Sequence, residues 1–174
     1  GKPVSIGELE GNILNTVTLK QVSVYESDKN KDKLVVFADK IEIKYSLRKI
    51  IFSPQDILQH IYKIKIYSPY IHLERDVGGM WNLAFLNEEA GAEQDAGISL
   101  KTNLELEIES GRGHYIDWRG WRREVLPERF ETEARDVNFS VKFDNEDVKL
   151  KLSSLVPGES KYNNLFIDGE INLQ

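Results

Sequence analysis

Apolar and polar side chains alternate with a period of two through most of this chain, and this alternation constrains the fold more than any other feature. Successive side chains of a β-strand leave on opposite faces, so the alternation predicts strands with one dry and one wet face. Five such runs lie at 35–45, 98–109, 137–143, 148–152 and 165–173. The apolar positions that we expect to line one shared face are Ile41, Ile43, Ile98, Leu100, Leu104, Leu106, Ile108, Val137, Phe139, Val141, Phe143, Leu150, Leu152, Leu165, Ile167 and Ile171.

Helical signals are confined to one or two short segments near 47–61. Ser53, Pro54 and Asp56 combine an N-cap, a proline at the first helical position and an early acid. So little helix cannot cover the apolar faces of roughly eight to ten strands, which must therefore pack against one another as a sandwich, a barrel or a curled groove. We predict a mainly β fold in which long amphipathic antiparallel strands form a curled sheet, open as a groove.

The alternation changes phase by one residue at two places, within 17–24 and, across Ser68 and Pro69, within 64–73. Such a change predicts a β-bulge. Because proline cannot donate to a central ladder, the second strand should kink at Pro69 or lie at an edge of the sheet. Turn-forming residues separate the strands, and we take the glycine-rich segment 111–113 to be a hairpin turn.

The chain of 174 residues is predicted to be a single β-rich domain. It divides into N-terminal strands with the short helix at 1–86, a flexible connection at 87–97 and C-terminal strands at 98–174. The connection carries four acids, three alanines and no bases, and it lacks apolar anchors. The chain begins without a methionine and stops inside an alternating run, which favours a fragment excised from a longer protein.

Composition and motifs argue against several functional classes. Lys and Arg number 23 and Asp and Glu 29, and the resulting net charge of −6 opposes nucleic-acid binding. The absence of cysteine removes thiolate nucleophiles and cysteine-based metal sites. His60, His72 and His114 lie far apart in sequence, and no phosphate loop, serine-hydrolase or zinc-protease motif is present. We therefore predict a protein that is not an enzyme, uses no cofactor and binds no metal.

A cluster of aromatic and arginine residues occupies 113–123. Interleaved rings and guanidinium groups suit anionic headgroups, a membrane interface or single-stranded nucleic acid, and the acidic net charge argues against the last of these. The alternative is a strand end and an exposed loop whose tryptophans cap the core. The residues that we consider for headgroup or interface contact are Trp118, Arg119, Trp121, Arg122 and Arg123.

Several segments also carry loose motifs in a distinctive order. The pattern I-G-x-(L/V)-x-G at 6–11 is followed by L-x-x-V-x-V at 19–24. The pattern I-x-(L/I)-x-x-P-x-(I/V)-x-L-x-R-x-x-x-G-x-W-N-(L/I) fits 64–83, and the segment 108–117 is similar to I-x-x-G-x-(L/V)-x-(Y/F)-x-D. In this order and spacing, the segments resemble the AsmA/TamB group of bacterial envelope proteins.

The resemblance implies an inner-membrane anchor upstream of the chain and a periplasmic β-groove, also called a β-taco, that carries lipid between the inner and outer membranes. The partners that it implies are phospholipid or other acyl chains, the inner membrane and outer-membrane assembly proteins. It supplies no catalytic residues. A second hypothesis is a dry structural module whose exposed edges bind client β-strands by augmentation, and an enzyme comes third.

Overall fold

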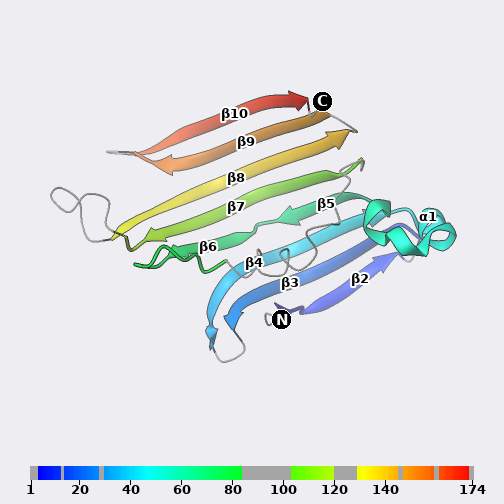
Figure 1. Ribbon diagram of the computed structural model, residues 1–174, viewed down its shortest axis with the longest axis horizontal. Coiled ribbons are helices and arrows are strands. Elements are labelled where there is room, and N and C mark those ends of the chain that lie inside the picture. The colour runs from blue at the N-terminus through cyan, green and yellow to red at the C-terminus, as the bar shows by residue number, and fades with distance from the viewer. Residues whose placement is uncertain are drawn as a thin grey trace.

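The computed structural model describes residues 4–12, 14–27, 30–83, 103–119, 129–144, 147–158 and 161–172. These residues form one ten-stranded sheet with one short α-helix and one 3-10 helix, which confirms the predicted mainly β class (Figure 1). The elements in chain order are β1 (Val4–Ser5), β2 (Glu8–Asn12), β3 (Thr16–Ser27), β4 (Asn30–Tyr45), α1 (Leu47–Phe52), η1 (Pro54–His60), β5 (Ile61–Tyr67), β6 (Tyr70–Arg75), β7 (Glu105–Asp117), β8 (Phe130–Asp144), β9 (Asp147–Pro157) and β10 (Tyr162–Asn172).

The strands lie in the order β1-β3-β4-β5-β7-β8-β9-β10, with β2 paired to β3 and β6 paired to both β4 and β7. Neighbouring strands are antiparallel except at β7, which runs parallel to β5 and β6, so the expectation of antiparallel strands throughout is wrong at this seam. The chain leaves β6 at Arg75 and joins β7 at Glu105, which is paired with Lys63 near the start of β5. A parallel neighbour requires such a crossover. The predicted connection at 87–97 falls within it and lies outside the described residues.

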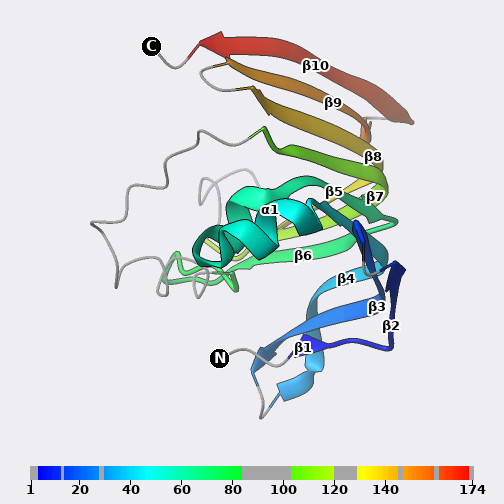
Figure 2. The ribbon, with the colours of Figure 1, turned by 90° about the vertical axis from the view of Figure 1, so that its right-hand side faces the viewer.

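The sheet is curled, as the view along the molecule in Figure 2 shows. Large hydrophobic side chains remain exposed on many of its strands. Leu9 on β2 is 71% exposed, and Phe166 on β10 is 73% exposed. A closed sandwich would bury most of such side chains, so the described strands form an open, curled sheet. The described residues contain five buried hydrophobic side chains, namely Val22, Val35, Ala38, Ile116 and Val141.

Four residues with left-handed backbone angles interrupt the strands. Gln21 in β3 has a φ of 52° and Ser68, between β5 and β6, has a φ of 46°, so the backbone kinks at both predicted phase changes. The strand pairing continues through both positions without a register shift, so these are kinks and not the predicted β-bulges. Ser110 in β7 and Asp136 in β8 have φ values of 55° and 48° and add two bulges that were not predicted. Ser68 lies beside β7, because its N–H donates to the Glu109 carbonyl at 2.8 Å. We call these four residues the bulge row.

The segment 111–113 is continuous strand within β7, so the predicted hairpin turn is wrong. Gly111 is buried, and a Cβ atom there would lie 3.1 Å from the Cγ2 of Ile108 and 3.2 Å from the Cγ of Pro69. The same Cβ would lie 3.3 Å from the carbonyl oxygen of Val137. This position therefore needs glycine because neighbouring strands approach closely beside the bulge row, and not because the chain reverses.

Candidate functional site

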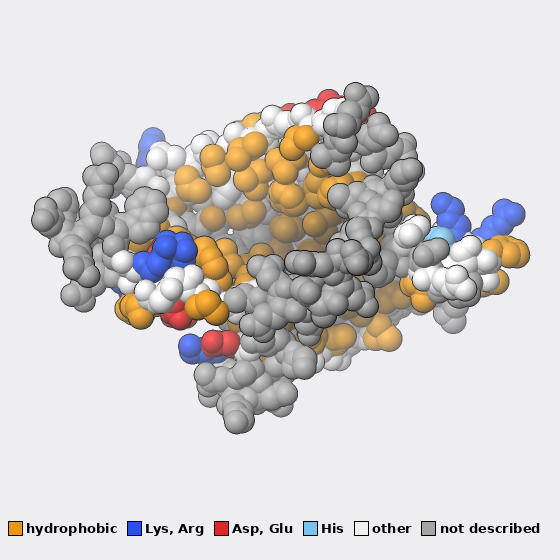
Figure 3. Space-filling model, in the orientation of Figure 1, with side chains coloured by type: hydrophobic (Ala, Val, Ile, Leu, Met, Phe, Trp, Pro, Cys, Tyr) orange, Lys and Arg blue, Asp and Glu red, His pale blue; other side chains and the backbone are white. Residues whose placement is uncertain are grey.

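The register of the sheet aligns apolar side chains from eight strands on one face. Residues directly opposite each other in neighbouring strands share a face and lie side by side. The first row consists of Leu9, Leu19, Ile41, Ile66, Ile108, Phe139, Leu152 and Ile167. The second row consists of Val17, Ile43, Ile64, Leu106, Val141 and Leu150. We call these two rows the apolar face, and Figure 3 shows hydrophobic side chains gathered in a hollow over β7 to β10.

The apolar face is accessible over much of its extent. Val141 is buried at 7%, but its neighbours in the rows from β4 to β9 are half-buried. Towards the β10 edge the exposure rises, to 44% for Ile167. These side chains contact their neighbours on adjacent strands of the sheet. Among the described residues, no helix or strand covers the two rows. The face can therefore accept an apolar ligand without first unfolding a core.

The opposite face of the same strands is ionic. On this face, lysines of β5 and glutamates of β7 form a cross-strand ladder. Lys63 donates to Glu107 at 2.8 Å, and Lys65 pairs with Glu109 at 2.7 Å. The Lys63 ammonium lowers the pKa of the Glu107 carboxyl, so this acid stays charged at neutral pH. The two faces of the sheet thus differ sharply in chemistry, and only the apolar face suits a hydrocarbon ligand.

The structure brings most of the predicted lining residues together. Nine of them, from Ile41 to Ile167, belong to the two rows, and Phe143 and Ile171 flank Val148 in a shorter third row on β8 to β10. Val137 lies opposite Gly111 beside the bulge row, and Leu165 lies opposite Ser154. Leu104 precedes β7 and accepts a hydrogen bond from the Phe143 N–H at 2.8 Å. Five predicted residues lie outside the described residues, namely Ile98, Leu100, Trp121, Arg122 and Arg123.

Several lining residues were missing from the predicted set. Val17 and Leu19 in β3, and Ile64 and Ile66 in β5, belong to the two rows. Both pairs alternate with polar residues in the sequence and carried the necessary signal. Both pairs flank the phase changes, and a phase change hides which parity faces the same side as the other strands.

Two of the five residues considered for headgroup contact, Trp118 and Arg119, are described, and acids hold both of them at the end of β7. Trp118 donates from Nε1 to Glu74 at 2.8 Å, and Arg119 pairs with Asp117 at 3.2 Å. The side chain of Asp117 is almost completely buried, and the Arg119 guanidinium and backbone N–H hold its pKa at about 2. Tyr115 stacks on Trp81 with ring centroids 5.8 Å apart. These contacts favour the capping alternative for Trp118 and Arg119.

Replacing Asp117 by Asn should therefore destabilise the protein in a pH-dependent way. The folded-state pKa lies below the ordinary value of 3.8, so the charged carboxylate stabilises the fold above about pH 4. This contribution is lost as the pH falls towards 2. We expect the urea midpoint of Asp117→Asn to lie below that of the unmodified chain at pH 7, and the gap to shrink between pH 4 and pH 2. A gap that stays constant with pH would show that the carboxylate charge is not the cause.

Two histidines that the sequence separates lie side by side. His72 and His114 are register partners on β6 and β7, with 3.2 Å between their Nδ1 atoms. The Nε2 of His114 lies 2.7 Å from Glu131, and that of His72 lies 3.4 Å from Glu74. The described residues contain no group of three or more His, Asp or Glu side chains that could hold a metal ion. Parallel pairing across the crossover created this contact, and no sequence spacing could have indicated it.

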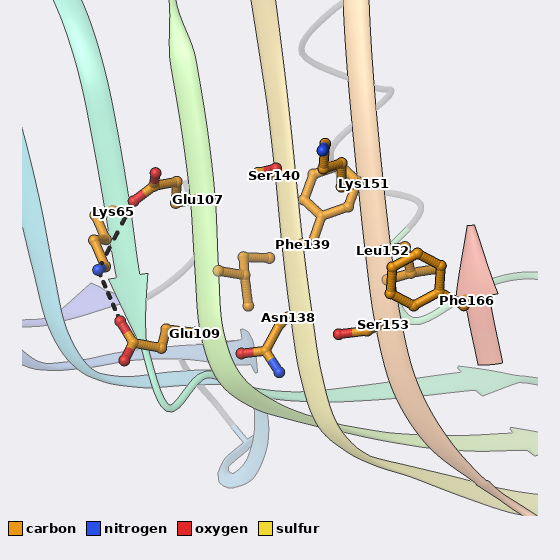
Figure 4. Close-up of a pocket in the computed structure, with 11 residues that line it drawn as sticks. Lys65, Glu107, Glu109, Asn138, Phe139, Ser140, Lys151, Leu152, Ser153 and Phe166 are labelled. Carbon is orange, nitrogen blue, oxygen red and sulfur yellow. Dashed lines mark ion pairs between the residues drawn. The ribbon is translucent and has the colours of Figure 1, made fainter. Parts of the chain in front are cut away.

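A depression of about 410 Å³ lies on the ionic face, where β7 to β9 bend (Figure 4). Lys65 stands at one side of it between Glu107 and Glu109, and both ion pairs are drawn in the figure. Lys151 on β9 pairs with Asp168 at 3.6 Å. Because its charged side chains neutralise one another, the depression is better explained by the bending of the strands than by ligand binding.

Comparisons with known proteins assign neither a family nor a function to this chain, so the function has to be inferred from the geometry of the site. No protein-family model matches the chain, and no curated protein matches it either. Within the described residues, no helix has the length and hydrophobicity needed to cross a bilayer.

Proposed function

We propose that this chain is a segment of a lipid-shielding groove of the AsmA/TamB kind, which passes phospholipid between the inner and outer membranes of a bacterial envelope. The observation that carries the proposal is the apolar face, which extends over eight strands and stays accessible while the other face is ionic. In this proposal the chain works in the periplasm, joined to the inner membrane by an anchor elsewhere in the protein. It performs no catalysis and needs no cofactor.

The dimensions of the apolar face suit an acyl chain. Eight neighbouring strands at a spacing of about 4.8 Å span about 34 Å. The hydrocarbon region of one leaflet is about 15 Å thick, half of the roughly 30 Å core of a bilayer. An acyl chain therefore fits across the strands with its full length against apolar side chains. Each buried methylene stabilises binding by about 0.8 kcal/mol, which makes a long chain a much better ligand than a short one.

The apolar face provides little basis for choosing among headgroups. Both rows consist of aliphatic side chains and Phe139, which have no hydrogen-bonding groups. Selectivity requires polar groups at fixed positions, and such groups lie on the opposite face of the sheet. We therefore expect the segment to hold lipids by their acyl chains and to accept several headgroups.

Native mass spectrometry of the chain purified from bacteria tests this proposal. We expect the folded protein to carry adducts with phospholipid masses, because the apolar face lowers the free energy of acyl chains relative to water. Organic extraction of the same sample should release the same lipids. A protein that is consistently lipid-free, with its apolar face protected from a hydrophobic dye, would instead indicate a dry structural module.

The second candidate function is the binding of client β-strands, and the edge strand β10 favours it. β10 pairs with β9 along 11 residues, and all of its residues are exposed. Leu165 and Phe166 are 39% and 73% exposed on its two faces. A long exposed edge of this kind is suited to the addition of another strand. Peptide binding that persists after lipid is removed would support this candidate over the groove.

A further inference from the structure

A small helical unit projects from one end of the sheet, between β4 and β5. It consists of α1 and η1, and we call residues 47–60 the helical tip. Figure 1 places α1 beyond the ends of the neighbouring strands, and Figure 3 shows the tip standing apart from the hollow with hydrophobic and basic side chains on its surface. The position of the tip separates it from the packing of the sheet.

Three hydrophobic residues of the tip are exposed. Ile51 is 65% exposed and Phe52 is 75% exposed, and none of the residues of α1 is buried. Ile57 in η1 is 51% exposed. A helix of six residues gains little stability from its own hydrogen bonds, and these side chains do not stabilise it by packing in a core. An apolar partner therefore best explains hydrophobic residues at this point.

The charges of the tip indicate the chemistry of that partner. Arg48 and Lys49 are exposed beside Ile51 and Phe52, and α1 contains no acid, whereas the one acid of the tip, Asp56, belongs to η1. Within the described part of the chain, neither cation has a carboxylate within ion-pair distance. The chain as a whole has a net charge of −6, so this local positive charge runs against the overall composition. An anionic surface would complement it.

A wide depression beside the tip has room for a polar headgroup. Its volume is about 780 Å³, and Arg48, Lys49, Phe52, His60 and Tyr62 contribute to its lining. Tyr62 is 45% exposed, and the amphipathic ring of tyrosine is favoured where a membrane meets water. Exposed apolar side chains next to cations and a tyrosine form the pattern of an interfacial membrane contact.

We propose that the helical tip docks on an anionic phospholipid bilayer, with Ile51 and Phe52 inserted at the interface and Arg48 and Lys49 against lipid phosphates. The proposal rests on the function proposed above in one respect, because it takes the apolar face to carry lipid. It adds which end of that face meets the membrane that supplies or receives the lipid. The docking surface itself shares no residue with the two apolar rows.

Sedimentation with lipid vesicles tests the apolar part of the contact. The probes are vesicles of phosphatidylcholine alone and of phosphatidylcholine mixed with phosphatidylglycerol. The purified chain should bind the mixed vesicles, and Ile51→Ser with Phe52→Ser should weaken this binding at least about tenfold. Phe166→Ser is the matched control, because Phe166 is nearly as exposed as Phe52, at 73%, but lies on β10. It should bind like the unmodified chain.

A charge-reversal pair tests the electrostatic part. Arg48→Glu with Lys49→Glu should abolish the preference for mixed vesicles, and added salt should weaken the binding of the unmodified chain. Lys149→Glu with Lys151→Glu on β9 makes the same change in net charge and should keep the preference. Equal binding to both kinds of vesicle, or equal losses in tip and control variants, would overturn the proposal. Dimers that dissociate when Ile51 and Phe52 are replaced would also overturn it, because a second copy would then be the partner.

The failure of this proposal can be told apart from the failure of the groove. The Ile51→Ser and Phe52→Ser variant should still carry phospholipid adducts in native mass spectrometry, since the apolar face is unchanged. Adducts without vesicle binding would refute docking and leave the groove in place. Vesicle binding by a chain that carries no adducts would refute the groove and retain the docking surface.

Discussion

Leu152→Arg should strip phospholipid from the chain without unfolding it. Leu152 occupies the first apolar row between Phe139 and Ile167 and is half-buried. On an accessible face the guanidinium keeps part of its hydration, so the cost to folding stays small, whereas an acyl chain would have to lie against a charge. We expect at least about tenfold less bound lipid by native mass spectrometry, together with a thermal midpoint within a few degrees of the unmodified chain.

Ser153→Arg is the matched control, because residue 153 leaves the same strand on the opposite face. This variant should keep its lipid. If Leu152→Arg unfolds the protein, the apolar face is a buried core and the dry module is the better description, since an unpaired buried charge costs several kcal/mol. If both variants keep their lipid, the adducts bind somewhere other than the two rows.

Gly111→Val should destabilise the sheet by about 3 kcal/mol or more. The added Cβ would meet Ile108, Pro69 and the Val137 carbonyl, all within 3.3 Å, and the further methyl groups need space that these three residues already occupy. The higher strand propensity of valine cannot compensate, because its whole range is about 1 kcal/mol. The free energy of unfolding measured in urea gives the effect directly.

Gly169→Val provides the comparison for this change. Gly169 lies in β10, and a Cβ there would have no atom within 4 Å. We expect this variant to stay within about 0.5 kcal/mol of the unmodified chain. Similar losses at both positions would mean that strand flexibility, and not the close approach beside the bulge row, determines the need for glycine at 111.

The strands of this protein could be predicted where alternation is long and regular. The runs at 137–143, 148–152 and 165–173 predicted parts of β8, β9 and β10, and one parity of each lies on the apolar face. The register between strands could not be predicted, since the sequence alone does not say which residue of one strand faces which residue of the next. The continuity of the rows over eight strands is therefore a result of the structure.

The positions of two of the four left-handed residues could be predicted and two could not, for a physical reason. At Gln21 and Ser68, bulky aliphatic residues on both sides of the kink make the change of phase visible. At Ser110 the following residues are glycine, arginine and glycine, which give no apolar parity and suggest a turn. The parallel seam beside it was also hidden, because it depends on a crossover between distant parts of the chain.

The groove is tested most directly by photocrosslinking at two adjacent positions of β9 in cells that contain the full protein. Leu150 lies in the second apolar row between Val141 and Gly169, and Lys151 leaves the strand on the ionic face, where its side chain is 67% exposed. A photoreactive residue at 150 should form phospholipid adducts, and the same residue at 151 should not. Equal labelling at both positions, or labelling at 151 alone, would contradict a groove that holds lipid on the apolar face.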